Sequence, residues 1–227
     1  MSSPEQFDPD VPLEKLFAML PVSLRRIAAV LRFEIRRTRT TQRMFALSII
    51  ILFPIAIMTL IRIQDNRIED EVWGLVVYGL IPQIVCMLGL LLWVAPVVHS
   101  ELEGRTWTYL AVRPSGKLSM LLGKYLNGVG WTLSGAWLGL TLGMLIAQPM
   151  LTEPFRFWWV MCLLSLLSCL AYGAVYSLLG ALFPRKSMVV TFAYMFVFEV
   201  VVSNIPAVIN QVTVHRRLLS LLFRLME

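Results

Sequence analysis

Residues 157–184 read FWWVMCLLSLLSCLAYGAVYSLLGALFP, a run of 28 residues without Asp, Glu, Lys, Arg or His. Two further uncharged runs, 72–98 and 125–152, have similar lengths. A helix needs about 20 apolar residues to cross the hydrocarbon core of a bilayer. Each run therefore predicts a membrane-spanning helix, and we expect an all-α, polytopic membrane protein.

The composition excludes an ordinary soluble globule. Of 227 residues, 58% are apolar and only 15% are charged, whereas soluble domains carry about 25% charged residues. The net charge of +6 does not indicate nucleic-acid binding, because membrane proteins concentrate Lys and Arg in cytoplasmic loops. The cysteines, Cys86, Cys162 and Cys169, lie in apolar stretches and predict neither disulfides nor a metal site.

The charge distribution predicts the topology. We expect a flexible N-terminal tail and short helix at 1–21 and a transmembrane domain at 44–209. Its five spans are expected at 44–61, 73–97, 123–147, 157–183 and 187–209. With the N-terminus inside, the cytoplasmic segments hold fourteen Lys and Arg residues and the outside loops hold three, while Arg216, Arg217 and Arg224 follow the fifth span and lie outside against this trend. This asymmetry predicts a multi-pass protein of the cell membrane, either a prokaryotic inner membrane or a plasma membrane, with a cytoplasmic N-terminus.

Residues 22–43 predict an N-terminal amphipathic helix that connects to the first span. Apolar residues recur there at spacings of three and four. A second stripe is basic and consists of Arg25, Arg32, Arg36, Arg39 and Arg43. Such a helix can lie at the membrane surface with its guanidinium groups on anionic headgroups. The alternative is a helix face that is simply solvated in the cytoplasm.

The last predicted span contains a carboxylate. Glu199 interrupts an apolar run that continues to Asn204 and Pro206. A carboxylate facing lipid would cost several kcal/mol, so we expect Glu199 to face a protein partner or a watery cavity and the helix to break near 204–206. Residues 210–227 predict an amphipathic segment that either lies on the outer surface or returns to the cytoplasm through a re-entrant turn.

Small residues repeat at every fourth position in two spans. Gly135, Gly139 and Gly143 form one series, and Gly173 and Ser177 belong to another. Small residues allow helix backbones to approach closely in membranes. The series predict helix packing, either within the chain or at a subunit interface.

The sequence lacks the motifs of several enzyme classes. Neither Gly-Lys pair has the first glycine or the Ser/Thr of a nucleotide-binding loop. His99 and His215 lie far apart, which argues against a zinc helix motif or a histidine relay. We expect no catalytic residue, no metal site and no enzymatic activity in this chain.

The connection between the second and third predicted spans, HSELEGRTWTYLAVRP at 99–114, combines charge and apolar residues. Its pattern predicts a short amphipathic helix at 100–113, ended by Pro114. A compact helix that presents a tryptophan and mixed charge suits docking into a groove of a soluble partner. The alternative is a surface loop resting on lipid headgroups.

Several motifs in this region carry a family resemblance. Glu103-Gly104-Arg105-Thr106, Leu110, Arg113-Pro114-Ser115 and Leu122-Gly123-Lys124 resemble the succession that follows the second span in permease subunits of type-2 ABC transporters. The basic helix before the first span, the short connection Pro184-Arg185-Lys186-Ser187, and the polar residues Glu199 and Asn204 add to the likeness. The family usually has six spans, whereas this chain predicts five.

The resemblance implies partners and contacts. It implies a second permease subunit, as a homo- or heterodimer, and cytosolic ATPase subunits that hold ATP and Mg²⁺, with no cofactor on this chain. The ATPase-coupling contacts would be Glu101, Glu103, Gly104, Arg105, Thr106, Trp107 and Leu110, with Arg185 and Lys186 as a second contact. The Arg-rich segment at 22–43 would be the connecting helix.

The sequence thus predicts the transmembrane subunit of an ATP-driven exporter, embedded in the lipid bilayer. One alternative is a non-transporting membrane scaffold that holds a cytosolic partner. Another is a carrier driven by an ion gradient through Glu199. The residues do not identify a substrate.

Overall fold

The computed structural model describes residues 22–64, 70–97, 116–147, 154–202 and 214–226. Every regular element in these ranges is a helix, which confirms the all-α class. In chain order the elements are α2 (Val22–Thr38), α3 (Thr41–Gln64), α4 (Asp70–Tyr78), η1 (Gly79–Val85), α5 (Cys86–Trp93), α8 (Gly116–Ala147), α9 (Pro154–Leu182), η3 (Pro184–Lys186), α10 (Ser187–Tyr194), η4 (Met195–Val202) and α11 (Val214–Met226).

Three stretches of the described helices are long and apolar enough to cross a bilayer: Thr41–Ile61, Val72–Trp93 and Pro154–Leu182. The chain therefore has the character of a membrane protein. The span predicted at 123–147 lies within α8, and the described part of the span predicted at 187–209 consists of α10 and η4, while 203–209 lie outside the described residues.

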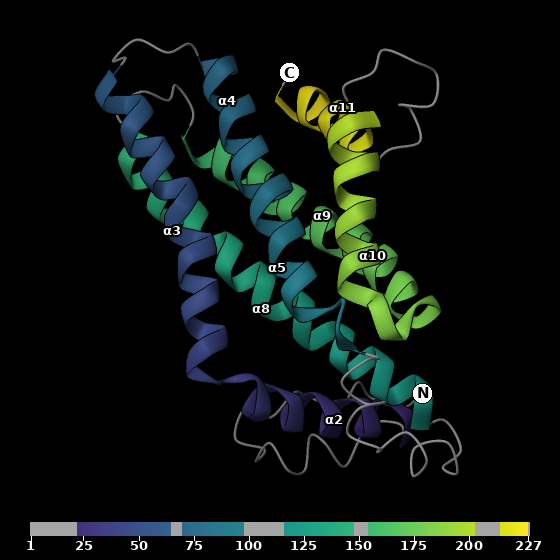
Figure 1. The fold of residues 1–227 in the computed structure, drawn as a ribbon. Helices are drawn as coiled ribbons and strands as arrows, with labels where there is room; N and C mark the ends of the chain where they lie inside the picture. The colour runs from purple at the N-terminus through teal and green to yellow at the C-terminus, as the bar shows by residue number, and fades with distance from the viewer. Residues whose placement is uncertain (1–21, 65–69, 98–115, 148–153, 203–213, 227) are drawn as a thin grey trace, which may run out of the picture.

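The long helices run back and forth between two ends of the bundle (Figure 1). Helix α2 lies across one end, close to the start of α3 and α8 and the end of α5. Helix α11 lies at the opposite end, near the start of α4. It packs on α9 and buries Leu218 and Leu222 in the main core.

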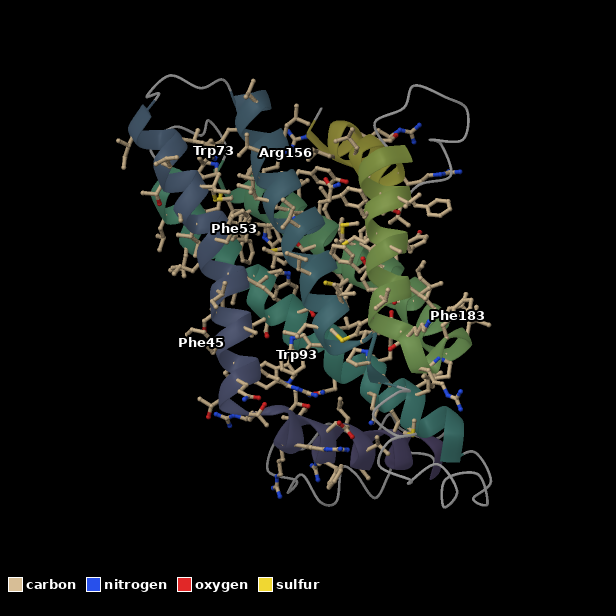
Figure 2. The ribbon with its side chains drawn as sticks, viewed as in Figure 1. Phe45, Phe53, Trp73, Trp93, Arg156 and Phe183 are labelled. Carbon is tan, nitrogen blue, oxygen red and sulfur yellow. The ribbon has the colours of Figure 1, made fainter. Side chains whose placement is uncertain are left out.

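The outer surface of the bundle is apolar. Large hydrophobic side chains project from several helices, among them Phe45, Leu60 and Ile63 of α3, Leu138 of α8, Phe155 of α9 and Phe192 of α10. Ile63 retains 81% of its accessible surface, and Figure 2 shows Phe45 and Phe183 at the edge of the bundle. Soluble monomers rarely expose contiguous apolar patches larger than a few hundred Å². Lipid is the solvent that suits this surface.

The helix predicted at 22–43 is interrupted in the structure. Helix α2 ends at Thr38 and α3 begins at Thr41, so Arg39 lies between them and Arg43 belongs to α3. The Thr40 N–H donates to the Thr38 carbonyl at 2.7 Å, and the Met44 N–H donates to the Thr40 carbonyl at 3.0 Å. Threonine favours helix N-caps over helix interiors, which explains why one helix ends and another begins in this Thr-rich segment. The predicted continuous helix was wrong at this point.

Two π-helical turns interrupt the apolar helices. The first, η1, contains Pro82, which has no N–H to donate to the helical ladder. The Ser168 hydroxyl of α9 donates to the Pro82 carbonyl. The second, η4, contains Glu199. Such turns are rare and often occur at functional sites.

The glycine series of α8 faces α3. A Cβ built on Gly135 would lie 3.1 Å from Leu47 Cδ1, and one on Gly143 would lie 2.6 Å from Met58 Sδ. At Gly139 the nearest atom, Ile51 Cγ2, is 3.5 Å away. These glycines therefore allow α3 and α8 to pack closely within one chain.

The two small residues predicted in the fourth span, Gly173 and Ser177, make different contacts. A Cβ on Gly173 of α9 would lie 2.9 Å from Tyr125 Cε2 of α8, so this glycine also marks a close helix contact. The Ser177 hydroxyl instead donates to the Ala174 carbonyl of its own helix at 2.8 Å.

Gly180 marks the tightest contact with backbone. A Cβ there would lie 2.8 Å from the Ala95 carbonyl oxygen. We expect Gly180→Leu to lower the free energy of unfolding by about 3 kcal/mol, because overpacking typically costs 1–3 kcal/mol and this carbonyl cannot rotate away. Thermal unfolding in detergent micelles measures the loss.

The matched control is Gly130→Leu, because a Cβ on Gly130 meets nothing within 4 Å. It should unfold near the wild-type temperature. Equal stability of the two variants would contradict the close packing at Gly180.

Candidate functional site

Helix α2 packs against the start of α8 through a glycine. A Cβ on Gly123 would lie 2.7 Å from Val30 Cγ1 and 3.5 Å from the Ile27 carbonyl oxygen. Any larger residue would push the helices apart. Gly123 therefore sets the close approach of α2 to the bundle.

A buried ion pair lies beside this contact. Lys124 Nζ of α8 is 3.6 Å from Glu34 Oε1 of α2, and Arg37 Nη1 is 3.8 Å from the same oxygen. Lys124 and Glu34 retain only 5% and 8% of their surface. Near the corner that ends α2, Asn127 Nδ2 donates to Thr38 Oγ1 at 3.0 Å. Helix α2 therefore contacts α8 at successive positions along its length.

The opposite face of α2 is basic and open. Arg32 and Arg36 of this helix are exposed, as is Arg39 in the link to α3. The face packed on α8 includes Glu34 and Thr38, whereas the apolar Ile35 is 40% exposed. The Arg25 position lies in the first turns of the helix. An exposed apolar residue next to an arginine stripe suits the boundary between headgroups and acyl chains.

An arginine and two tryptophans pack together near the end of the bundle that carries α2. Arg43 Cζ of α3 lies 5.3 Å from the ring centroid of Trp93 in α5. The Trp93 and Trp131 rings stack with centroids 6.0 Å apart and an interplanar angle of 16°. Cation–π contacts of this kind contribute about 0.5–2 kcal/mol. Arg43 thus belongs to a cluster that joins α3, α5 and α8, and not to the arginine stripe of α2.

The predicted coupling residues are described only in part. Arg185 and Lys186 are exposed in η3, which joins α9 to α10 toward the end of the bundle that carries α2 (Figure 1). The residues predicted between the second and third spans lie outside the described residues: Glu101, Glu103, Gly104, Arg105, Thr106, Trp107 and Leu110.

A polar cluster lies inside the bundle. Glu199 of η4 is fully buried, and its carboxylate accepts a hydrogen bond from the Tyr172 hydroxyl of α9 at 3.0 Å. The Tyr194 hydroxyl donates to the other carboxylate oxygen at 3.5 Å. The tyrosines stabilise the carboxylate, since an unpaired one would be costly in an apolar environment. Glu199 faces its own chain, whereas the sequence predicted a partner or a watery cavity.

Further tyrosines surround this carboxylate. The Tyr176 ring lies between those of Tyr172 and Tyr194, with centroid distances of 6.2 and 6.5 Å. Tyr78 of α4 lies within electrostatic range of Glu199. The Tyr176 hydroxyl is buried and makes no hydrogen bond with another described group. Asn204, predicted beside this cluster, lies outside the described residues.

The sequence predicted Glu199 but missed its tyrosine partners, because tyrosine in an apolar run has no distinctive spacing. It also missed the Glu34–Lys124 pair. One signal was available: Glu34 is the only acidic residue among the arginines of 22–43. A lone carboxylate in a basic helix suggests a partner on another element.

No family model, no curated protein and no solved structure matches this chain.

Proposed function

We propose that the chain is the transmembrane permease subunit of a type-2 ABC exporter, which forms the translocation path and binds separate ATPase subunits. The observation that carries the proposal is helix α2. It lies across one end of the bundle and is fixed to α8 by Gly123 and the Glu34–Lys124 pair. A partner that moves α2 must therefore move α8.

The proposed topology has five spans, formed by α3, by α4 with η1 and α5, by α8, by α9, and by α10 with η4. Exposed basic residues are more numerous toward the end with α2, namely Arg32, Arg36, Arg39, Arg185 and Lys186, than at the opposite end, where Arg156, Arg217 and Arg224 are exposed. Basic residues favour the cytoplasmic side. In this topology α2 lies at the inner surface of a cell membrane, the N-terminus is cytoplasmic, and α11 faces the outside.

Force would reach the bundle through short cytoplasmic elements. ATP-driven dimerisation of the partner subunits would displace the segment at 100–113, η3 and α2. Because α2 and α8 move together, α8 would slide against α3 along Gly135, Gly139 and Gly143. Such sliding would shift the helices between two packings, and the affinity of the substrate for each packing would set the direction of transport.

Charge reversal at the coupling segment tests this proposal. The double variant Glu103→Lys with Arg105→Glu keeps the net charge but inverts the docking pattern. We expect ATPase subunits to copurify at least about tenfold less with this variant, since misplaced charge at an interface costs several kcal/mol. The amount of ATPase in the eluate and its ATP hydrolysis are the readouts.

The control is Arg67→Glu with Glu69→Lys, the same reversal in a connection predicted outside. It should retain the ATPase at the wild-type level. Equal retention by both variants would contradict the coupling role. A scaffold would bind its partner but show no ATP-dependent flux in reconstituted vesicles.

A carrier driven by an ion gradient is the second candidate, and the buried Glu199 cluster favours it. A carrier predicts that Glu199→Gln abolishes uptake into vesicles, whereas ATP depletion has no effect. The exporter predicts the opposite dependence on ATP. Uptake assays with both treatments separate the two functions.

A further inference from the structure

The link between α2 and α3 presents basic and polar side chains at one end of the bundle. Arg39 lies in the link itself, and Arg43 lies in the first turn of α3. Both are exposed, and the three residues between them are polar and exposed as well. The sequence contains no acidic residue from 35 to 64. Residues 39–43 therefore form a basic corner without a neighbouring carboxylate along the chain.

The length of α3 places the basic corner at the membrane surface. The apolar stretch Thr41–Ile61 has 21 residues and rises about 31 Å at 1.5 Å per residue. The hydrocarbon core of a bilayer is about 30 Å thick, so the first turn of α3 lies at the level of the headgroups. Figure 2 shows Trp93 toward this end of the bundle. Its position agrees with the same depth, because tryptophans gather at membrane interfaces.

Arg43 is ordered within the chain. Its Cζ lies 5.3 Å from the ring centroid of Trp93, which stacks on Trp131. A side chain that is already ordered loses less entropy when it binds a ligand. The planar fork of a guanidinium also matches the oxygens of a phosphate group. The basic corner is therefore suited to a phosphate.

An apolar face of α3 begins directly beyond the basic corner. Phe45, Ile49 and Leu52 recur at spacings of four and three, and all three are exposed. Only 17% of the most apolar stretch of α3 is buried within the chain, against 56% for Val72–Trp93 and 44% for Pro154–Leu182. A ligand here meets cations first and then an apolar strip. A phospholipid carries a charged headgroup and acyl chains in that order, whereas an acidic protein surface offers no acyl chain.

We propose that the basic corner binds the headgroup of an anionic phospholipid, with one acyl chain along Phe45, Ile49 and Leu52. The two arginines favour an anionic headgroup over a zwitterionic one, because a zwitterionic headgroup brings a cation of its own. Phospholipid binding here requires only that the chain spans a membrane. It does not depend on the ATPase partners of the proposed exporter.

Lipid binding to the purified chain in a neutral detergent tests the site. Phosphatidylglycerol and phosphatidylcholine with the same acyl chains are titrated separately, and bound lipids are counted by native mass spectrometry. An arginine near an anionic surface contributes on the order of 1 kcal/mol, or about fivefold in affinity. With two arginines we expect phosphatidylglycerol to bind about tenfold more tightly than phosphatidylcholine. Equal affinity for the two lipids would overturn the proposal.

Arginine variants locate the binding. Arg39→Gln should weaken phosphatidylglycerol binding about fivefold, and Arg39→Gln with Arg43→Gln about thirtyfold. Arg39 is an exposed residue of the link, so the single variant should unfold at the wild-type temperature without lipid. The control is Arg156→Gln with Arg224→Gln, which removes two exposed arginines at the opposite end of the bundle. It should keep the wild-type affinity, and a loss equal to that of the corner variant would contradict the site.

The acyl chain has its own test. Glycerol phosphate carries the charged headgroup without acyl chains, so in large excess it should leave phosphatidylglycerol bound. Phe45→Ser with Leu52→Ser should weaken lipid binding about tenfold, because it removes apolar surface along the acyl chain. Leu138→Ser with Leu142→Ser, on an exposed face of α8, is the matched control and should bind as the wild type does. Displacement by glycerol phosphate, or equal affinity of the two serine variants, would contradict a phospholipid site.

Discussion

Replacing Lys124 with methionine should release α2 from the bundle. The change leaves Glu34, which retains 8% of its surface, without its buried partner on α8. Removing one member of a fully buried ion pair costs about 3–5 kcal/mol. Arg37 also contacts Glu34, so we expect a loss near 2–3 kcal/mol and a roughly thirty- to 150-fold shift toward undocked α2.

Limited digestion with trypsin measures this release, because α2 carries exposed arginines such as Arg32 and Arg36. Cleavage within α2 should accelerate while the rest of the chain stays protected. The control is the double variant Glu34→Met with Lys124→Met, which removes both charges. Replacing a whole buried pair by apolar residues is often neutral, so this variant should recover most of the protection. A double variant cleaved as fast as Lys124→Met would contradict a paired Glu34.

Glu199→Leu should destabilise the bundle more than any other single change in the polar cluster. Leucine removes the acceptor of the Tyr172 and Tyr194 hydroxyls. A buried polar group left without a partner costs about 1–3 kcal/mol. We therefore expect a net loss of about 2–4 kcal/mol after the gain from the apolar side chain. Thermal unfolding in micelles, followed by tryptophan fluorescence, measures it.

Two variants dissect the effect. Glu199→Gln keeps an acceptor in place and should lose about 1 kcal/mol, while Tyr172→Phe removes one donor to the carboxylate and should lose about 1.5–3 kcal/mol. Phe198→Leu, which loses only the ring stacked on Tyr194 at 5.2 Å, should be nearly neutral. An equally small loss for Glu199→Leu would mean that the cluster does not hold the helices together.

The helices were predictable because long uncharged runs leave few alternatives. A span such as 157–184 cannot fold otherwise in lipid, since every backbone group must bond within its own helix. The corner at Thr38 to Thr41 was not predicted, because the arginine spacing continues across it and only the threonines break the pattern. The π-helical turns also escaped prediction, since Pro82 indicates a distortion but not its type.

The candidate site was less predictable. Gly135, Gly139 and Gly143 indicated a packing face, but only the structure identifies α3 as its neighbour. Lys124 was read as part of a Leu-Gly-Lys motif, whereas it pairs with Glu34, 90 positions earlier in the chain. Pairs this distant in sequence leave no periodic signal, and they depend on how helices cross in space.

The most direct test of the proposed exporter is a photocross-link from α2 in native membranes. A photoreactive amino acid at Arg36, which is exposed, should capture a cytosolic subunit whose peptides include a nucleotide-binding loop, identified by mass spectrometry. The same amino acid at Phe155, which is exposed in the first turn of α9 and adjoins Arg156, shown in Figure 2 at the end opposite α2, should not. Capture of that subunit from Phe155, or its absence from Arg36, would contradict the proposal that α2 receives force from an ATPase.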